Sequence, residues 1–101
     1  MVVAEVSIFP LGTGEPSVSR YVAAAVRELE ASGLRCFLGP MGTTIEAETP
    51  EEVYAALSRA QAAVFELGAG RAYTVIKMDE RRDVEGRSVE DMVRSVREQS
   101  S

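Results

Sequence analysis

The sequence predicts an α+β domain in which a four-stranded antiparallel sheet carries helices on one face. Two patterns indicate it: strand-like runs with period-2 alternation or β-rich composition, and helix-like runs with apolar residues at 3.6-residue spacing. The predicted strands cover residues 2–10, 34–38, 44–48 and 71–82, and the predicted helices follow Ser17, Thr49 and Ser88. This order, βαββαβ with a C-terminal helix, is the ferredoxin-like split βαβ arrangement, with the first and third strands in the centre.

The first predicted strand has one uniformly apolar face and one mixed face. The apolar face consists of Val2, Ala4, Val6 and Ile8, and the mixed face of Glu5, Ser7 and Phe9. Pro10 has no N–H to give to a sheet, so strand pairing is expected to end there.

The helix signals are clearest at residues 49–52. Thr49 is placed to cap a helix, Pro50 suits its first position, and Glu52 completes a capping box. The first helix is expected to begin with Ser17 as N-cap and to stop at Gly33. The expected apolar stripes are Val18, Val22, Ala25, Val26 and Leu29 in the first helix, and Val89, Met92, Val93 and Val96 in the last.

Composition excludes several classes of function. The 101 residues suffice for one domain, and 16 acidic against 11 basic residues disfavour nucleic-acid binding. The chain has no histidine, which removes the commonest general base and metal ligand, and its one cysteine, Cys36, cannot form an internal disulfide. It has no apolar run that would span a bilayer and no basic start typical of a signal peptide, so a cytoplasmic protein without a membrane partner is expected.

Two Gly/Pro loops, at residues 10–14 and 39–44, have similar sequences. The first and second strands run in the same direction in the predicted fold, so both loops should lie at one edge of the sheet and meet in space. The start of the first helix and Arg71 should lie at that edge too, and the combination would suit an anion such as phosphate. The simpler interpretation, which we favour, is that these glycines only make tight turns.

The sheet face away from the helices, here called the open face, is the predicted functional surface. It combines aromatic rings, carboxylates and hydroxyls, namely Phe9, Phe37, Tyr73, Glu5, Glu46, Glu48, Asp79, Ser7 and Thr44. One interpretation is a solvated face whose charges pair across strands, for instance Glu5 with Lys77. However, three aromatic rings favour pairing of subunits through this face. An aromatic-lined, carboxylate-rich cavity between paired sheets would suit a flat, nitrogen-rich, cationic heterocycle.

Several linked motifs resemble the small thiamine-binding protein family across nearly the whole chain. They are the stretch 4–14 with Ser17-Val18-Ser19, then Pro40-Met41-Gly42-Thr43 with Ile45-Glu46, and then Arg71 with Ile76-Lys77-Met78-Asp79 and Arg81-Arg82-Asp83. The resemblance implies a ferredoxin-like fold, a dimer of dimers, and binding of thiamine or a related pyrimidine without catalysis or a separate cofactor. The chain departs from the family pattern at Ala47, where a glycine is expected, and at Thr49-Pro50, where an aromatic residue often follows the second glutamate.

The ligand is expected at the open face and at a subunit interface. The residues expected to bind it are Glu5, Ser7, Phe9, Phe37, Thr43, Thr44, Glu46 and Glu48. Two other functions stay open. An oligomeric regulatory or sensor domain for another small ligand or anion would use the same fold, and a carboxylate-based hydrolase or isomerase would use Glu5 and Glu46 as acid and base. No fixed spacing marks these two carboxylates as catalytic, so binding without catalysis is the preferred prediction.

Overall fold

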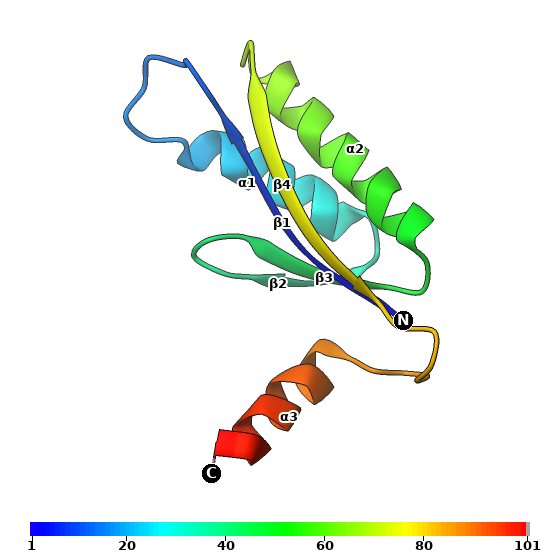
Figure 1. The fold of residues 1–101 in the computed structure, drawn as a ribbon. Coiled ribbons are helices and arrows are strands. Elements are labelled where there is room, and N and C mark those ends of the chain that lie inside the picture. Colours follow the sequence, from blue (N-terminus) through cyan, green and yellow to red (C-terminus); the bar gives the residue numbers. More distant parts are fainter. Residues whose placement is uncertain (101) are drawn as a thin grey trace.

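Four strands form one antiparallel sheet in the order β2-β3-β1-β4. In the computed structural model, which describes residues 1–100, the strands are β1 (Val2–Pro10), β2 (Arg35–Leu38), β3 (Thr43–Ala47) and β4 (Ala72–Glu80). The helices are α1 (Ser19–Ala31), α2 (Pro50–Glu66) and α3 (Val89–Ser100). This order, with β1 and β3 in the centre, confirms the predicted ferredoxin-like fold (Figure 1).

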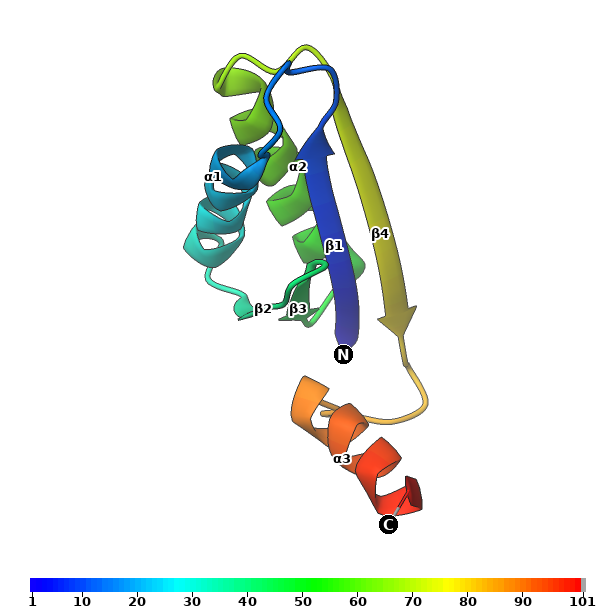
Figure 2. The same cartoon turned by 90° about the vertical axis from the view of Figure 1, so that its left-hand side faces the viewer.

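Helices α1 and α2 cover one face of the sheet (Figure 2). The core lies between these helices and the apolar strand faces, because alternate residues of each strand point toward the helices. Its strand residues include Val2, Ala4, Val6, Ile8, Ile45 and Ala47, and its helix residues include Tyr21, Ala25, Leu29, Val53, Ala60 and Val64. The predicted faces of β1 are therefore confirmed. Burial of these apolar side chains is the main term that stabilises the fold.

The two long helices start in different ways. At α2 the Thr49 hydroxyl accepts from the Glu52 N–H at 3.3 Å, and the Glu52 carboxylate accepts from the Thr49 N–H at 3.1 Å, which is the predicted capping box. Helix α1 begins at Ser19 without a side-chain cap. The prediction of Ser17 as its N-cap is wrong by one residue, because the N-cap is Val18, whose carbonyl accepts the Val22 N–H at 3.1 Å. The Ser17 hydroxyl accepts from the Ser19 N–H at 3.3 Å just before the helix.

The β2–β3 hairpin is shorter than β1. Strand β3 pairs with β1 only as far as Val6, which lies opposite Thr43, whereas β4 pairs with β1 as far as Pro10. The Gly39 N–H donates to the Gly42 carbonyl at 2.9 Å and closes the hairpin at this point. The last part of β1 therefore has a neighbouring strand on one side only.

This length difference separates the two Gly/Pro loops that we expected to meet. Strand β1 carries its loop well past the hairpin loop before the chain turns. There the Leu11 N–H donates to the Arg71 carbonyl at 3.0 Å, so the loop after β1 lies beside the start of β4. The expectation that Arg71 lies near this loop is met, whereas the expectation of a joint site made by both loops is not.

Helix α3 lies apart from α1 and α2, near the end of the sheet where β1 starts (Figures 1 and 2). Ser88 caps it as predicted: the Asp91 N–H donates to the Ser88 hydroxyl at 3.1 Å, and the Ser88 N–H donates to the Asp91 carboxylate at 3.0 Å. None of the α3 side chains is buried, and Val96 in its apolar stripe is 69% exposed. Within residues 1–100, no helix has the length and apolar character needed to cross a membrane.

Candidate functional site

A cavity of about 300 Å³ lies where the hairpin stops short of β1. Its walls are the last part of β1, the hairpin loop around residues 39–42 and the apolar side of α1. Three of the residues predicted to bind a ligand, Ser7, Phe9 and Thr43, line it. The cavity thus combines an aromatic ring and two hydroxyl-bearing residues with a largely apolar wall, which is typical of a small-molecule pocket.

One wall of the cavity consists of the residues predicted to form the apolar stripe of the first helix. All five line it: Val18, which precedes α1, and Val22, Ala25, Val26 and Leu29. Of these only Ala25 and Leu29 are buried, together with Tyr21 and Ala24, so the packed face of the helix is rotated relative to the predicted stripe. The cause is the short hairpin, because it leaves the valine side of α1 without a strand beneath it.

Glu5 places a carboxylate beside this cavity. It is exposed on the open face, opposite Thr44 of β3 and Lys77 of β4. A methyl group added to Gly42 would lie 3.2 Å from Cγ of Glu5, so the Glu5 side chain lies directly against the loop that lines the cavity. This position adds a negative charge next to an apolar space.

Further predicted residues extend the open face from Glu5. Thr44 lies opposite Glu5, and Phe37 lies opposite Thr44 in the next strand. Next to the cavity, the rings of Phe9 and Tyr73 contact each other with centroids 5.4 Å apart. The open face therefore carries a hydroxyl beside the Glu5 carboxylate and an aromatic pair four residues further along β1.

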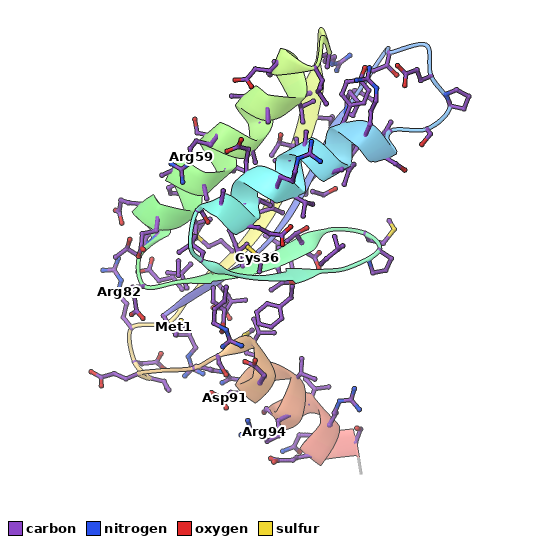
Figure 3. The ribbon with its side chains drawn as sticks, turned by 180° about the vertical axis from the view of Figure 1, so that it is seen from behind. Met1, Cys36, Arg59, Arg82, Asp91 and Arg94 are labelled. Carbon is purple, nitrogen blue, oxygen red and sulfur yellow. The ribbon has the colours of Figure 1, made fainter. Side chains whose placement is uncertain are left out.

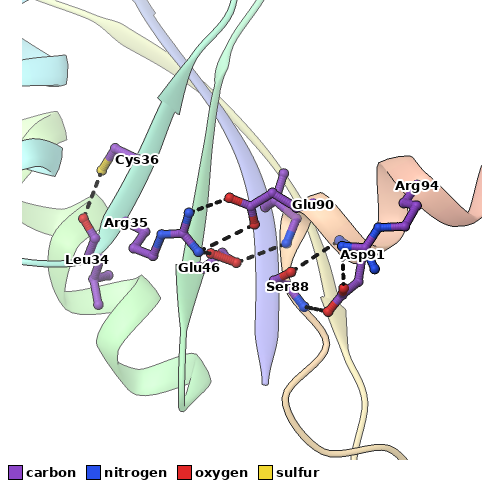
Figure 4. A network of polar contacts seen from close by, with 9 residues as sticks. Leu34, Arg35, Cys36, Glu46, Ser88, Glu90, Asp91 and Arg94 are labelled. Carbon is purple, nitrogen blue, oxygen red and sulfur yellow. Dashed lines mark hydrogen bonds and ion pairs between the residues drawn. The ribbon is translucent and has the colours of Figure 1, made fainter.

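Glu46 lies on the same face, but its carboxylate is not free. It is only 5% exposed: one oxygen lies 2.9 Å from Nη1 of Arg35, and the other accepts from the Val89 N–H at 2.9 Å (Figure 4). Arg35 also pairs with Glu90. We call this set, Arg35, Glu46, Val89 and Glu90, the α3 anchor. A buried carboxylate needs such partners, and here they join the sheet to the first turn of α3.

The acidic groups in the first turn of α3 are held in their charged form. The hydrogen bond from Arg35 keeps the pKa of Glu90 below its ordinary value, and the Ser88 N–H does the same for the pKa of Asp91. Nη2 of Arg94 lies 3.0 Å from an Asp91 carboxylate oxygen. Figure 3 shows both residues on α3 from behind the molecule. Sequence reasoning identified Ser88 as a cap but not the contact between Glu46 and Val89, which spans 43 residues.

Glu48 and Ala47 lie away from the cavity. Glu48 follows β3 and is exposed at the other end of the sheet, near Met1 and Arg81. The methyl group of Ala47, where the family resemblance led us to expect a glycine, packs in the core opposite Val2. It points to the helix side and does not project from the open face.

The remaining groups of chemical interest are possible metal ligands and the single thiol. Residues 1–100 contain no group of three or more His, Cys, Asp or Glu side chains that would hold a metal ion. Burial raises the pKa of the Cys36 thiol, whose sulfur lies 3.4 Å from the Leu29 carbonyl oxygen. A protonated thiol in this position is a packing residue.

The fold and the cavity together define a small ferredoxin-like domain with a ligand-sized cavity at the edge of its sheet. A family model described as thiamine-binding protein matches residues 4–97, and the chain belongs to this family. The chain is 44% identical over 98 residues to the UPF0045 protein of Methanothermobacter thermautotrophicus, and the match covers 97% of this chain and 98% of that one.

Two further relatives agree with this assignment. The UPF0045 protein YqgV of Bacillus subtilis is 41% identical over 87 residues, which cover 82% of this chain and 83% of YqgV. The crystal structure of the hypothetical protein MJ1052 from Methanocaldococcus jannaschii is similar with a TM-score of 0.85, at 36% identity and 96% coverage of both chains. The structural likeness covers the whole fold described above.

Proposed function

We propose that this protein binds thiamine or a thiamine-related pyrimidine, without catalysing a reaction, in the cavity between β1, the hairpin loop and α1. The observation that carries the proposal is the cavity itself, with Ser7, Phe9 and Thr43 in its wall and Glu5 beside it. Its volume of about 300 Å³ is at the lower end of the range for small-ligand pockets. The description of the family as thiamine-binding supports the same ligand class.

Each part of the cavity has a role in this proposal. The ring of Phe9 and the valines of α1 contact the flat heterocycle, and the hydroxyls of Ser7 and Thr43 exchange hydrogen bonds with its polar atoms. Glu5 attracts the positive charge of the thiazolium ring or of a protonated pyrimidine. In a dimer of dimers, a second subunit would cover Thr44 and Phe37 and extend the site.

The state of the carboxylates favours binding over catalysis. An acid–base pair made by Glu5 and Glu46 would need a second free carboxylate near Glu5. Both oxygens of Glu46 are already engaged by Arg35 and by the Val89 N–H. Glu46 is therefore not free to divide acid and base roles with Glu5.

Titration calorimetry with thiamine and with 4-amino-5-hydroxymethyl-2-methylpyrimidine tests the proposal. We expect saturable heat with at least one of them, together with a higher melting temperature, because a ligand that binds only the folded state stabilises it. A correctly folded protein that gives no heat at millimolar ligand would rule the proposal out. A melting temperature that ignores every pyrimidine would favour the alternative of a sensor domain for another ligand.

Glu5→Gln is expected to weaken binding of thiamine. Loss of the charge removes about 1–3 kcal/mol, which corresponds to roughly 5- to 150-fold in affinity. Glu48→Gln is the matched control, because it makes the same chemical change at the far end of the sheet. Calorimetry should show weaker binding for the first variant alone, and equal affinities for the two variants would remove Glu5 from the site.

A further inference from the structure

The cavity contains a part of the β1 backbone that has no strand partner. The direction of the backbone groups follows from two observations. A methyl group on Gly42 would lie 3.1 Å from the Val6 carbonyl oxygen, so the backbone C=O of Val6 points toward the hairpin. The Leu11 N–H donates to the Arg71 carbonyl, so the backbone N–H of Leu11 points toward β4. Because successive residues of a strand direct their N–H and C=O groups to opposite sides, the backbone groups of the even-numbered residues of β1 point toward the hairpin side.

Ile8 is the next even-numbered residue after Val6, and no strand lies on that side of it. Strand β3 ends at Thr43, opposite Val6, and Ile8 lines the cavity while being only 5% exposed. None of the described hydrogen bonds outside the strand ladders involves Ile8. Pro10, the next residue of β1 whose backbone faces the hairpin side, has no N–H to donate. Ile8 is thus the residue of β1 that offers both a donor and an acceptor to the cavity.

We propose that the Ile8 backbone recognises the aminopyrimidine edge of the ligand. The Ile8 N–H donates to the ring nitrogen next to the amino group, and the Ile8 carbonyl accepts from that exocyclic amine. A 4-aminopyrimidine presents an acceptor beside a donor, which is the complement that an antiparallel strand residue would present to Ile8. This inference rests on the proposed function of the cavity. It adds that the site recognises the amino group of the ligand together with the adjacent ring nitrogen.

The proposal also explains how a site with few polar side chains selects its ligand. A buried N–H and a buried C=O without partners are costly, so a ligand that satisfies both is favoured over one that satisfies one or neither. The neighbouring residues cannot substitute, because Ser7 and Phe9 lie opposite Val75 and Tyr73 and direct their backbone groups toward β4. The selected class is therefore heterocycles with an amino group next to a ring nitrogen.

The test uses amide exchange by NMR and calorimetry on the full chain. In the free protein, the Ile8 amide should exchange at least about tenfold faster than the paired amides of Val6 and Ser7. Addition of 4-amino-5-hydroxymethyl-2-methylpyrimidine should shift the Ile8 amide proton downfield and slow its exchange, while the Ser7 amide stays unchanged. The 4-dimethylamino analogue, which has lost the donor, should bind at least about tenfold more weakly.

The outcomes separate this inference from the proposed function. Binding of the aminopyrimidine without a change at the Ile8 amide, or with equal affinity for the dimethylamino analogue, overturns the inference and leaves the proposed function standing. Absence of any binding heat overturns both. Exchange at Ile8 as slow as at Val6 in the free protein also overturns the inference, because the backbone would then already be paired.

Discussion

At the scale of single residues, Gly42 controls how closely the hairpin loop approaches β1. A Cβ at this position would lie 3.1 Å from the Val6 carbonyl oxygen and 3.2 Å from Cγ of Glu5. The Glu5 side chain can move, but the Val6 oxygen belongs to a central strand. We expect Gly42→Ala to destabilise the fold by about 1 kcal/mol, which lowers the melting temperature by roughly 4–8 °C in a domain of this size.

Gly70→Ala is the control for this measurement. A Cβ on Gly70 would meet no atom within 4 Å, and its backbone does not have the positive φ that disfavours other residues. Thermal unfolding followed by circular dichroism should leave this variant close to the parent. Equal melting temperatures for both variants would show that the loop accommodates the extra methyl group at Gly42 without cost.

Residue placement on the strands could be predicted from the sequence, because a strand has a fixed two-residue period. This period predicted that Val2 and Ile8 are buried and that Glu5 lies on the open face. The engagement of Glu46 could not be predicted in this way. Its partners Arg35 and Val89 come from other elements, and only the tertiary arrangement brings them together.

At the scale of elements, α1 shows the limit of a periodic pattern. The spacing of its valines predicted correctly that they share one face. The spacing did not predict whether that face packs on a strand or lines a cavity, because this depends on the length of the β2–β3 hairpin relative to β1. The sequence therefore predicted the fold and the shared face of these valines, but not the cavity that this face lines.

The α3 anchor should depend on Glu46. Glu46→Ala removes the acceptor of the Val89 N–H and the partner of Arg35, so we expect α3 to detach while the sheet with α1 and α2 stays folded. Hydrogen exchange should become faster at the Val89 amide and remain slow in β1. Glu46→Gln keeps an acceptor oxygen and is expected to have a smaller effect. Unchanged exchange at Val89 in both variants would show that the anchor does not hold α3.

The anchor should also weaken in acid. The pKa values of Glu90 and Asp91 are lowered in the folded protein, so their charged forms stabilise the first turn of α3 above the ordinary values of 4.5 and 3.8. This contribution is lost as the pH falls through the lowered pKa values. The protection factors of the amides in the first turn of α3, which compare the measured exchange rate with the intrinsic rate at the same pH, should therefore fall below about pH 4 relative to pH 7. Protection factors that stay constant down to pH 2 would contradict this expectation.

At the scale of the whole molecule, the sheet is covered unequally. The molecule measures 44 × 30 × 18 Å, and α1 and α2 cover only one side of the sheet. On the edge strand β4, Tyr73 and Val75 are 48% and 49% exposed on the open face. Long, exposed, apolar edge strands favour pairing with another chain, which agrees with the dimer of dimers that the family resemblance implies.

We expect the protein to form a tetramer and Val75→Lys to weaken it. The charged side chain would have to enter an apolar contact on the open face. Glu66→Lys, a larger change of charge on α2, is the control on the opposite layer of the molecule. Light scattering after size-exclusion chromatography should give the mass of four chains for the parent and the control, and a smaller mass for Val75→Lys. A monomeric parent would contradict the expectation.

The length of the β2–β3 hairpin determines how much of the space beside β1 stays open as a cavity. Each residue added to both arms of the hairpin would extend β3 along β1 by about 3.4 Å and fill the cavity from one end. Lengthening by two residues would bring β3 level with Ile8. The length of the hairpin therefore sets the length of the cavity, and insertions or deletions in this one surface loop can alter the cavity while the core stays the same.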